Sequence, residues 1–283
     1  MKLPSLVCPY NQALLDQIKG HDIAIKVNHP SDISPATAYV RSSGNSLINV
    51  IVEIEKPLNT IYFQEDWEGI PMALFAPEMG NFRDIFKQIH KIRDLKVHVY
   101  FPVENDENLA SSHILASLGI TCCLTFGEKK PNWDALSDLM TYAVLGSVPH
   151  APIEPFHHIA YHYNPGNYVD WGSVYFDDPK EFLHMDSRGR VALSHHELLN
   201  GSFIAEDISI LKDPFANTGY MEGINAWRQC FLSDHPCITC EGWKICLGKF
   251  TVNDKPIEGC STFITEMLAV IEQYWAEREQ GRL

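Results

Sequence analysis

The sequence is short of positive charge and has no long apolar run. It contains 22 Lys and Arg residues against 36 Asp and Glu residues, a formal net charge of -14. Nucleic-acid binding depends on neutralising phosphates with Lys and Arg, so we expect no nucleic-acid partner. No run of 18 apolar residues occurs, and we therefore expect no membrane partner. The sequence also has no Gly-rich phosphate-binding motif and no G-x-S-x-G elbow, which leaves nucleotide-binding and serine-hydrolase functions without support.

The N-terminus lacks the features of a secreted protein. Residues 1–8 read MKLPSLVC, with a single Lys and too few apolar residues before Asn11 for the core of a signal peptide. Val7 is also not the small residue expected before a lipoprotein cysteine. We therefore expect a cytoplasmic protein, whose eight cysteines are thiols or metal ligands rather than disulfides.

Four cysteines near the C-terminus are the most informative feature. Cys237, Cys240 and Cys246 form a C-x2-C-x5-C run, and Cys260 follows 14 residues later. Cysteines spaced C-x-x-C can bind one metal centre, and Gly242 allows the chain to turn back and bring Cys246 to it. The sequence therefore predicts a four-thiolate site for either zinc or a 4Fe-4S cluster, because both accept four cysteines.

The middle of the sequence alternates short β-branched runs with segments of helical period. This pattern predicts β-α units on a mainly parallel sheet, an α/β fold. The predicted strands are 47–54, 60–63, 72–75, 96–101 and 120–126, and the predicted helices are 82–93, 108–118 and 133–144.

The character of the sequence changes after Pro149, where a Pro-, His- and aromatic-rich passage begins. We therefore predict two domains, residues 1–155 and 156–283. In the second, residues 182–193 predict a hairpin, since short apolar runs flank a polar turn that ends in Gly189. Residues 261–277 predict a closing helix, with apolar side chains mostly on one face.

These features resemble a known family. The predicted hairpin, the C-x2-C-x5-C run and Cys260 are similar to the SPASM domain, the cysteine-rich C-terminal extension of radical S-adenosylmethionine enzymes that modify peptides and proteins. Residues 97–105 look like a barrel strand with its polar loop. The resemblance covers roughly residues 47–275. It implies a partial (β/α) barrel of the radical-S-adenosylmethionine type, followed by a small SPASM-like α+β domain.

The resemblance also implies which parts are missing. SPASM domains usually hold two auxiliary 4Fe-4S clusters, and Cys237, Cys240, Cys246 and Cys260 match the ligands of one. Where the other cluster needs cysteines, this chain has Phe250, Ser194 and His195. The C-x3-C-x2-C motif that radical chemistry requires is absent. Cys230 is a fifth thiol in this region and is a candidate replacement for one ligand.

The leading interpretation is a non-catalytic protein that holds one auxiliary-type 4Fe-4S cluster and assists peptide or protein modification, with a peptide or protein as its partner. A second hypothesis is a cluster-dependent redox enzyme that does not cleave S-adenosylmethionine, with substrate near Glu104, His98 or His195. A third is a zinc-stapled scaffold for a partner protein.

Overall fold

A curved nine-stranded sheet organises the chain. The computed structural model describes residues 3–211, 213–225, 228–252 and 255–280, except for the side chain of Cys230. The strand order is β7-β6-β5-β4-β3-β2-β1-β8-β9, and every neighbouring pair is parallel except β8 and β9. The strands are β1 Ser5–Pro9, β2 Asp22–Val27, β3 Ser46–Glu53, β4 Met72–Phe75, β5 Val97–Pro102, β6 Cys122–Thr125, β7 Ile153–Glu154, β8 Phe182–Met185 and β9 Val191–Ala192.

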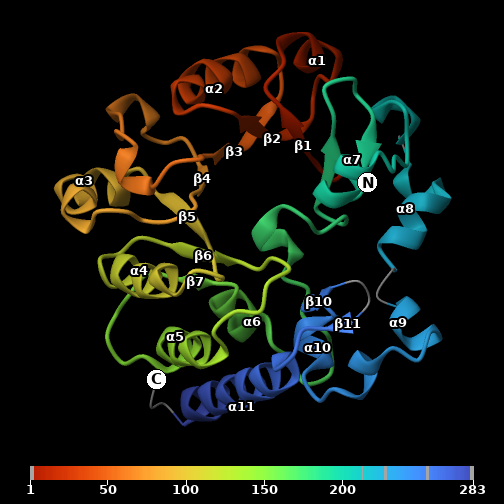
Figure 1. The fold of residues 1–283 in the computed structure, drawn as a ribbon. Coiled ribbons are helices and arrows are strands. Elements are labelled where there is room, and N and C mark those ends of the chain that lie inside the picture. Colours follow the sequence, from red (N-terminus) through yellow and green to blue (C-terminus); the bar gives the residue numbers. More distant parts are fainter. Residues whose placement is uncertain (1–2, 212, 226–227, 253–254, 281–283) are drawn as a thin grey trace.

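Helices follow the strands along the chain. The first five α-helices are α1 Gln12–Gln17, α2 Ile33–Ser42, α3 Phe82–Asp94, α4 Asp106–Ser117 and α5 Trp133–Leu145. Figure 1 shows α1 to α5 on the convex side of the sheet. Each of α2, α3, α4 and α5 follows a strand along the chain. The residues before α3, α4 and α5 are asparagines, and each caps its helix with a side-chain oxygen: Asn81, Asn105 and Asn132.

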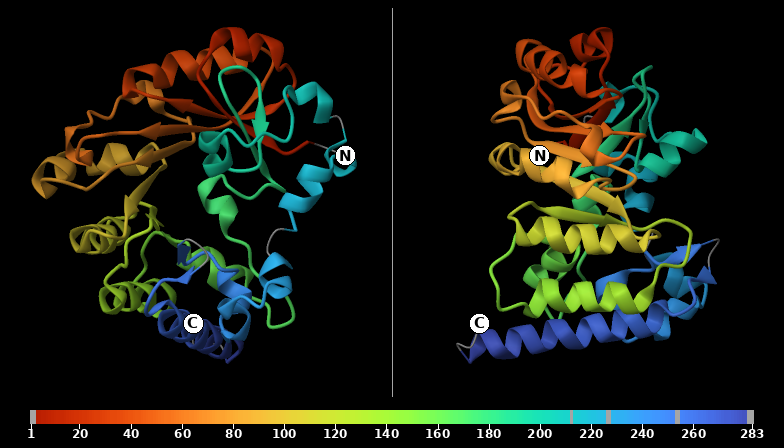
Figure 2. Two further views of the ribbon diagram at one scale, coloured as in Figure 1. Left: turned by 45° about the vertical axis from the view of Figure 1, so that its right-hand side comes forward. Right: turned by 60° about the vertical axis from the view of Figure 1, so that its left-hand side comes forward.

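The C-terminal part is built from short helices and one long helix. The helices are α6 Phe156–His162, α7 His195–Asn200, α8 Thr218–Gly223, α9 Arg228–Leu232, α10 Trp243–Cys246 and α11 Cys260–Glu279. Two short strands, β10 Thr251–Val252 and β11 Lys255–Pro256, pair with each other. Both views of Figure 2 show α11 below the sheet and alongside α5. No helix in the described ranges is long and apolar enough to cross a membrane.

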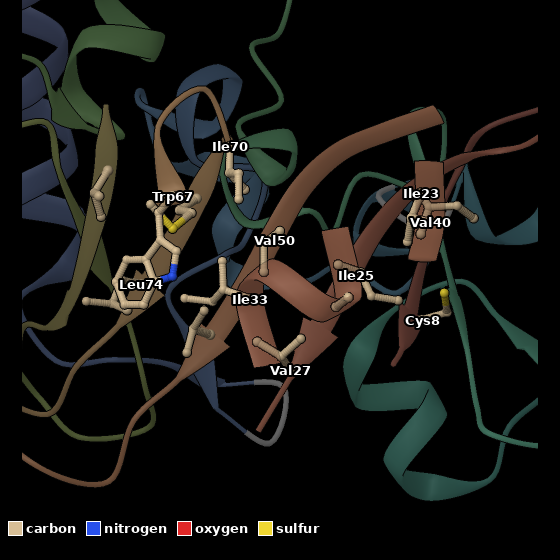
Figure 3. Close-up of a cluster of buried hydrophobic side chains, with 14 of the residues drawn as sticks. Cys8, Ile23, Ile25, Val27, Ile33, Val40, Val50, Trp67, Ile70 and Leu74 are labelled. Carbon is tan, nitrogen blue, oxygen red and sulfur yellow. The ribbon is translucent and has the colours of Figure 1, made fainter. Parts of the chain in front are cut away.

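The largest core lies between the convex face of the sheet and the helices. Alternate strand residues such as Ile23, Ile25 and Val27 point into it, as Figure 3 shows, together with Ile33 of α2 and Trp67. Period-two alternation places their neighbours on the other face of the sheet. A second core joins α5, α6 and α11 to the segment around Cys246.

The concave face of the sheet is covered by the protein's own chain. The 3₁₀ turn η4 (Gly172–Tyr175) and Phe176 lie in the concavity, where Figure 1 shows this green segment. Phe176 belongs to a cluster with inward-facing residues of seven strands, among them Val7, Ala24 and Tyr100. The Tyr100 hydroxyl donates to the Val174 carbonyl at 2.8 Å, and the Tyr175 hydroxyl donates to the Leu124 carbonyl at 2.6 Å. We call residues 172–178 the plug.

The structure confirms the α/β prediction and most of its elements. The predicted strand at 60–63 is wrong. Buried Ile61 and Phe63 alternate with exposed Tyr62, as in a strand, but the amide side chain of Gln88 bonds the Ile61 carbonyl and the Phe63 N–H in place of a neighbouring strand. The first 46 residues, for which the sequence predicts no element, supply the interior strands β1 and β2.

The predicted hairpin at 182–193 is confirmed as β8 and β9. The Asp186 carboxylate fixes its turn, because it accepts the N–H groups of Arg188 and Arg190 and the Arg190 guanidinium. The hairpin extends the large sheet, since β8 pairs in parallel with β1. The division at 155 stays a prediction.

Candidate metal centre

The four predicted cysteines come together from three neighbouring segments. Cys237 lies in the 3₁₀ turn η7 (Pro236–Thr239), with Cys240 directly after it. Cys246 is the last residue of α10, and Cys260 is the first residue of α11. Their side chains line one small cavity of about 60 Å³. The structure therefore brings together the four thiols that the sequence singled out.

Glycines and left-handed residues shape the loop around these thiols. A Cβ at Gly242 would collide with the side chain of Ile264, so the loop approaches α11 as closely as it does only with glycine there. After Cys246 the chain reverses through Leu247 and Gly248, which both have positive φ angles, 52° and 78°. This reversal turns the N–H groups that follow Cys246 back toward its sulfur.

The thiols differ in exposure and in their electrostatic surroundings. Cys246 and Cys260 are each 8% exposed, whereas Cys237 and Cys240 are only half-buried. Burial raises the pKa of the Cys246 thiol, while backbone N–H groups of Phe250, Gly248 and Lys249 act in the opposite direction. Burial also raises the pKa of Cys260, and the nearby Cys246 and Cys240 raise it further. Backbone donors of this kind stabilise a thiolate and tune a bound cluster.

An aromatic layer separates residues 236–249, which we call the cysteine loop, from the rest of the core. Phe250 is 3% exposed, and its ring contacts Phe126 at 4.9 Å and Trp133 at 5.7 Å between centroids. Trp171 and Phe263 complete the layer, each with a centroid 6.0 Å from that of Phe250. The position where the resemblance implies a cysteine of the other cluster is therefore filled by a packed apolar side chain.

A short segment before the plug is tied to the cysteine loop. The Val169 N–H donates to the Lys244 carbonyl at 2.8 Å, and the Trp171 indole N–H donates to the Ile245 carbonyl at 2.8 Å. Between them, the Asp170 carboxylate pairs with Lys249 at 3.0 Å. Three consecutive residues thus join the plug to the loop that carries Cys246. No feature of the sequence pointed to this contact, because its two sides lie about 75 residues apart.

The arrangement of the thiols can be compared with what each candidate metal requires. Zinc takes sulfur at about 2.3 Å, so four thiolates around it lie within about 4 Å of each other. In the part of the chain that the structure describes, no three His, Cys, Asp or Glu side chains converge in this way on a single ion. The four cysteines line one cavity. Four thiols are a donor set that either zinc or a cubane cluster accepts.

The other predicted residues take up different positions. The backbone N–H of His195 donates to Asp177 at 3.1 Å, and its ring lies 3.4 Å from the Lys26 ammonium, which pairs with Glu53 at 3.0 Å. Glu104 accepts the Gly127 N–H at 2.7 Å and so bridges two loops. His98 is exposed on β5. The structure brings none of these three to the cysteines, and the side chain of Cys230 lies outside the described ones.

Solved structures show what this architecture resembles. No protein-family model matches the sequence, and no curated protein matches it. Among solved structures, the crystal structure of SuiB from Streptococcus suis bound to S-adenosylmethionine superimposes with a TM-score of 0.52 at 11% identity, covering 91% of this chain and 77% of SuiB. A second SuiB crystal structure gives a TM-score of 0.51 at 12% identity over the same shares of the two chains. The chain has a radical-S-adenosylmethionine-like fold.

Within this radical-S-adenosylmethionine-like fold, two further features concern β1 and the concave face of the sheet. Cys8 is the sole cysteine before Cys122. It lies within β1 and is fully buried in the core on the helix side of the sheet. The concave side is occupied by the plug, with Tyr175 hydrogen-bonded to β6.

Proposed function

We propose that this chain is a non-catalytic protein of radical-S-adenosylmethionine-like fold that holds one 4Fe-4S cluster in a degenerate SPASM-like domain. Cys237, Cys240, Cys246 and Cys260 would bind the cluster. The observation that carries this proposal is that the four thiols line one cavity. A cluster with four cysteine ligands supplies a structural brace or one-electron transfer.

The chain's own residues prepare the cavity for such a group. Trp243, Phe250 and Ile264 line it and exclude water from the buried side, where Cys246 and Cys260 lie. The N–H groups after Cys246 offset the cost of burying its thiolate. The half-buried Cys237 and Cys240 leave the opposite side nearer to solvent.

Two observations support a non-catalytic role. The sequence has no C-x3-C-x2-C motif, and Cys8 points away from the concavity of the sheet. The plug fills that concavity with Phe176 and Tyr175, held by hydrogen bonds to β5 and β6 residues. In this proposal the barrel is a scaffold, and the protein assists the modification of a peptide or protein partner.

The experiment that tests this role measures S-adenosylmethionine chemistry on metal-loaded protein. Protein purified anaerobically and reconstituted with iron and sulfide is mixed with dithionite and S-adenosylmethionine, and 5′-deoxyadenosine is quantified. We expect a loaded cluster and no 5′-deoxyadenosine above the protein-free control. Formation of 5′-deoxyadenosine by the loaded protein would overturn the non-catalytic assignment.

One observation favours the redox-enzyme hypothesis as a second candidate. Glu53, Lys26, His195, Asp177 and His184 form a continuous chain of polar contacts near the carboxyl ends of β2, β3 and β8, the edge at which α/β barrels place active sites. Turnover of a substrate with a reductant, without cleavage of S-adenosylmethionine, would support this candidate. A zinc-stapled scaffold is separated from both by metal content.

A further inference from the structure

A second cavity lies at the end of the sheet, away from the cysteines. It has a volume of about 560 Å³, within the range of ligand sites, and lies between α5, β7, α6 and Tyr274 of α11. Four histidines line it, His150, His157, His158 and His162, together with Glu154. No Lys or Arg is among the described residues that line the cavity.

The hydrogen bonds of the histidines define what they offer a ligand. His150 and His162 each place Nδ1 against a backbone carbonyl, at 2.9 Å and 2.8 Å, and His158 places Nε2 against the Asp170 carbonyl at 3.1 Å. A carbonyl only accepts, so these ring nitrogens carry the proton, and in the neutral ring the other nitrogen is an acceptor. Three imidazoles of the cavity are therefore available as hydrogen-bond acceptors.

The acidic residue of the cavity is Glu154, whose pKa is raised by burial, while the His158 N–H and the nearby His162 act in the opposite direction. Glu154 accepts the His158 N–H at 2.8 Å, and no ion pair joins it to a described Lys or Arg. Burial lowers the pKa of His157 and of His158, so both rings are neutral at neutral pH. A partly buried carboxylate beside the two neutral imidazoles of His157 and His158 is a favourable place for a cation.

The walls of the cavity add a second feature that suits an organic cation. Tyr161, which is 67% exposed, and Tyr274 present aromatic rings, and Ala143, Val144 and Ala160 present apolar surface. Aromatic faces attract ammonium and guanidinium groups, and apolar walls accept their alkyl chains. A small metal ion is a poorer fit, since no three described ligand side chains converge on one point.

We propose that this cavity binds the cationic side chain, ammonium or guanidinium, of a Lys or Arg residue in the partner peptide. That the cation belongs to a peptide rests on the proposed function, whereas the preference for a cation rests on the residues of the cavity itself. The acidic carboxylate of Glu154 pairs with the cation, the imidazole nitrogens accept its remaining hydrogens, and Tyr161 covers its stem.

Calorimetric titration of the full chain with N-acetyl-argininamide and N-acetyl-lysinamide tests this proposal. N-acetyl-citrullinamide is the matched probe, because it has the shape of the arginine derivative without its charge. We expect saturable binding of the charged probes and at least tenfold weaker binding of citrulline, since a charge-assisted hydrogen bond is lost. Equal binding of the charged and neutral probes, or no saturable binding, would overturn the proposal. Tighter binding of free spermidine than of either amide would overturn the assignment to a peptide.

Two surface variants make the test independent of folding. Val148 lines the cavity and is 65% exposed, so Val148→Lys introduces a competing ammonium without disturbing buried residues. Ile210→Lys is the matched control, because Ile210 is 63% exposed and lies in the 3₁₀ turn η5 (Ile208–Leu211), outside the cavity. We expect Val148→Lys to weaken binding at least tenfold and Ile210→Lys to leave it unchanged. Equal effects would contradict the proposal. Metal content measured on the same samples reports separately on the proposed cluster.

Discussion

The indole N–H of Trp171 donates to the carbonyl oxygen of Ile245 at 2.8 Å, and this contact joins the plug to the cysteine loop. Trp171 immediately precedes η4, and Ile245 immediately precedes Cys246. Both residues are buried, at 3% and 0% exposure. The segment that fills the concavity of the sheet and the helix that carries a predicted metal ligand are thus parts of one packed unit.

Trp171→Phe removes this hydrogen bond and keeps most of the ring. We expect a loss of roughly 1–2 kcal/mol in the free energy of unfolding, because a buried carbonyl loses its partner. Amide hydrogen exchange should become faster in residues 169–178 and in α10. Trp275→Phe is the matched control, since its indole N–H donates to the Ala160 carbonyl at 3.0 Å on α6. Faster exchange of α10 in the control, and none in Trp171→Phe, would contradict the described link.

Cys246→Ala removes the more deeply enclosed member of the C-x2-C-x5-C run. We expect loss of the bound metal and faster hydrogen exchange in residues 236–260, because metal binding and local folding are coupled. Cys8→Ala is the control. It removes a fully buried thiol from the core on the helix side, so we expect lower stability. The ratio of metal to protein should not change, because Cys8 is not one of the four proposed ligands. Retention of full metal content by Cys246→Ala would show that this thiol is not a ligand.

Gly242→Ala tests the close approach of the cysteine loop to α11. The new methyl group would overlap the side chain of Ile264, so we expect a loss of about 1–3 kcal/mol in stability and weaker metal retention. Adding Ile264→Ala makes room for the methyl group and should restore metal retention. Gly166→Ala is the control, because Gly166 is exposed and has an ordinary backbone conformation. Failure of the double variant to recover any metal would argue against overlap as the cause.

His157→Gln tests the pH dependence of stability. Burial lowers the pKa of His157 below 6.5, its value in the unfolded chain. The folded protein therefore binds fewer protons than the unfolded chain, and the free energy of unfolding falls as pH drops below about 7. Glutamine does not titrate, so the free energy of unfolding of the variant should fall less steeply between about pH 7.5 and pH 5 than that of the wild type. The two slopes should differ by less than about 1.4 kcal/mol per pH unit.

The control for this measurement is His90→Gln, a change at an exposed histidine of α3. Denaturant titrations at each pH give the free energies of unfolding of the two variants and of the wild type. The opposing effect of Glu154, whose pKa is raised by burial, is common to all three proteins. Identical pH dependence in His157→Gln and wild type would contradict the burial of an uncharged ring.

Local pattern was sufficient to predict the middle of the fold. Strands such as β5 and helices such as α3 and α5 have strong period-two or helical spacing, and their bounds differ from the prediction by one or two residues. The prediction of a strand at 60–63 was wrong because the segment alternates buried and exposed residues like a strand, whereas the side chain of Gln88 supplies its hydrogen bonds. That side-chain contact across 25 residues leaves no local signature.

The candidate site also has a part that the sequence predicts and a part that it does not. Spacing alone grouped Cys237, Cys240, Cys246 and Cys260, because a C-x2-C pair followed by further cysteines is typical of metal-binding loops, and the four line one cavity. The plug and its link through Trp171 were not predictable, because they depend on which residues fill the concavity of the sheet. The histidine cavity was missed because its ligand pattern arises from hydrogen bonds to carbonyls, which fix the protonated nitrogen of each ring.

Metal analysis of anaerobically purified protein tests the central claim most directly. Iron, acid-labile sulfide and zinc are quantified per chain, and the dithionite-reduced sample is examined by electron paramagnetic resonance. We expect about four iron atoms and four sulfides per chain, with little zinc, and loss of both iron and sulfide in Cys246→Ala. One zinc per chain, or no metal at stoichiometric occupancy, would contradict the assignment of a 4Fe-4S cluster to the four thiols.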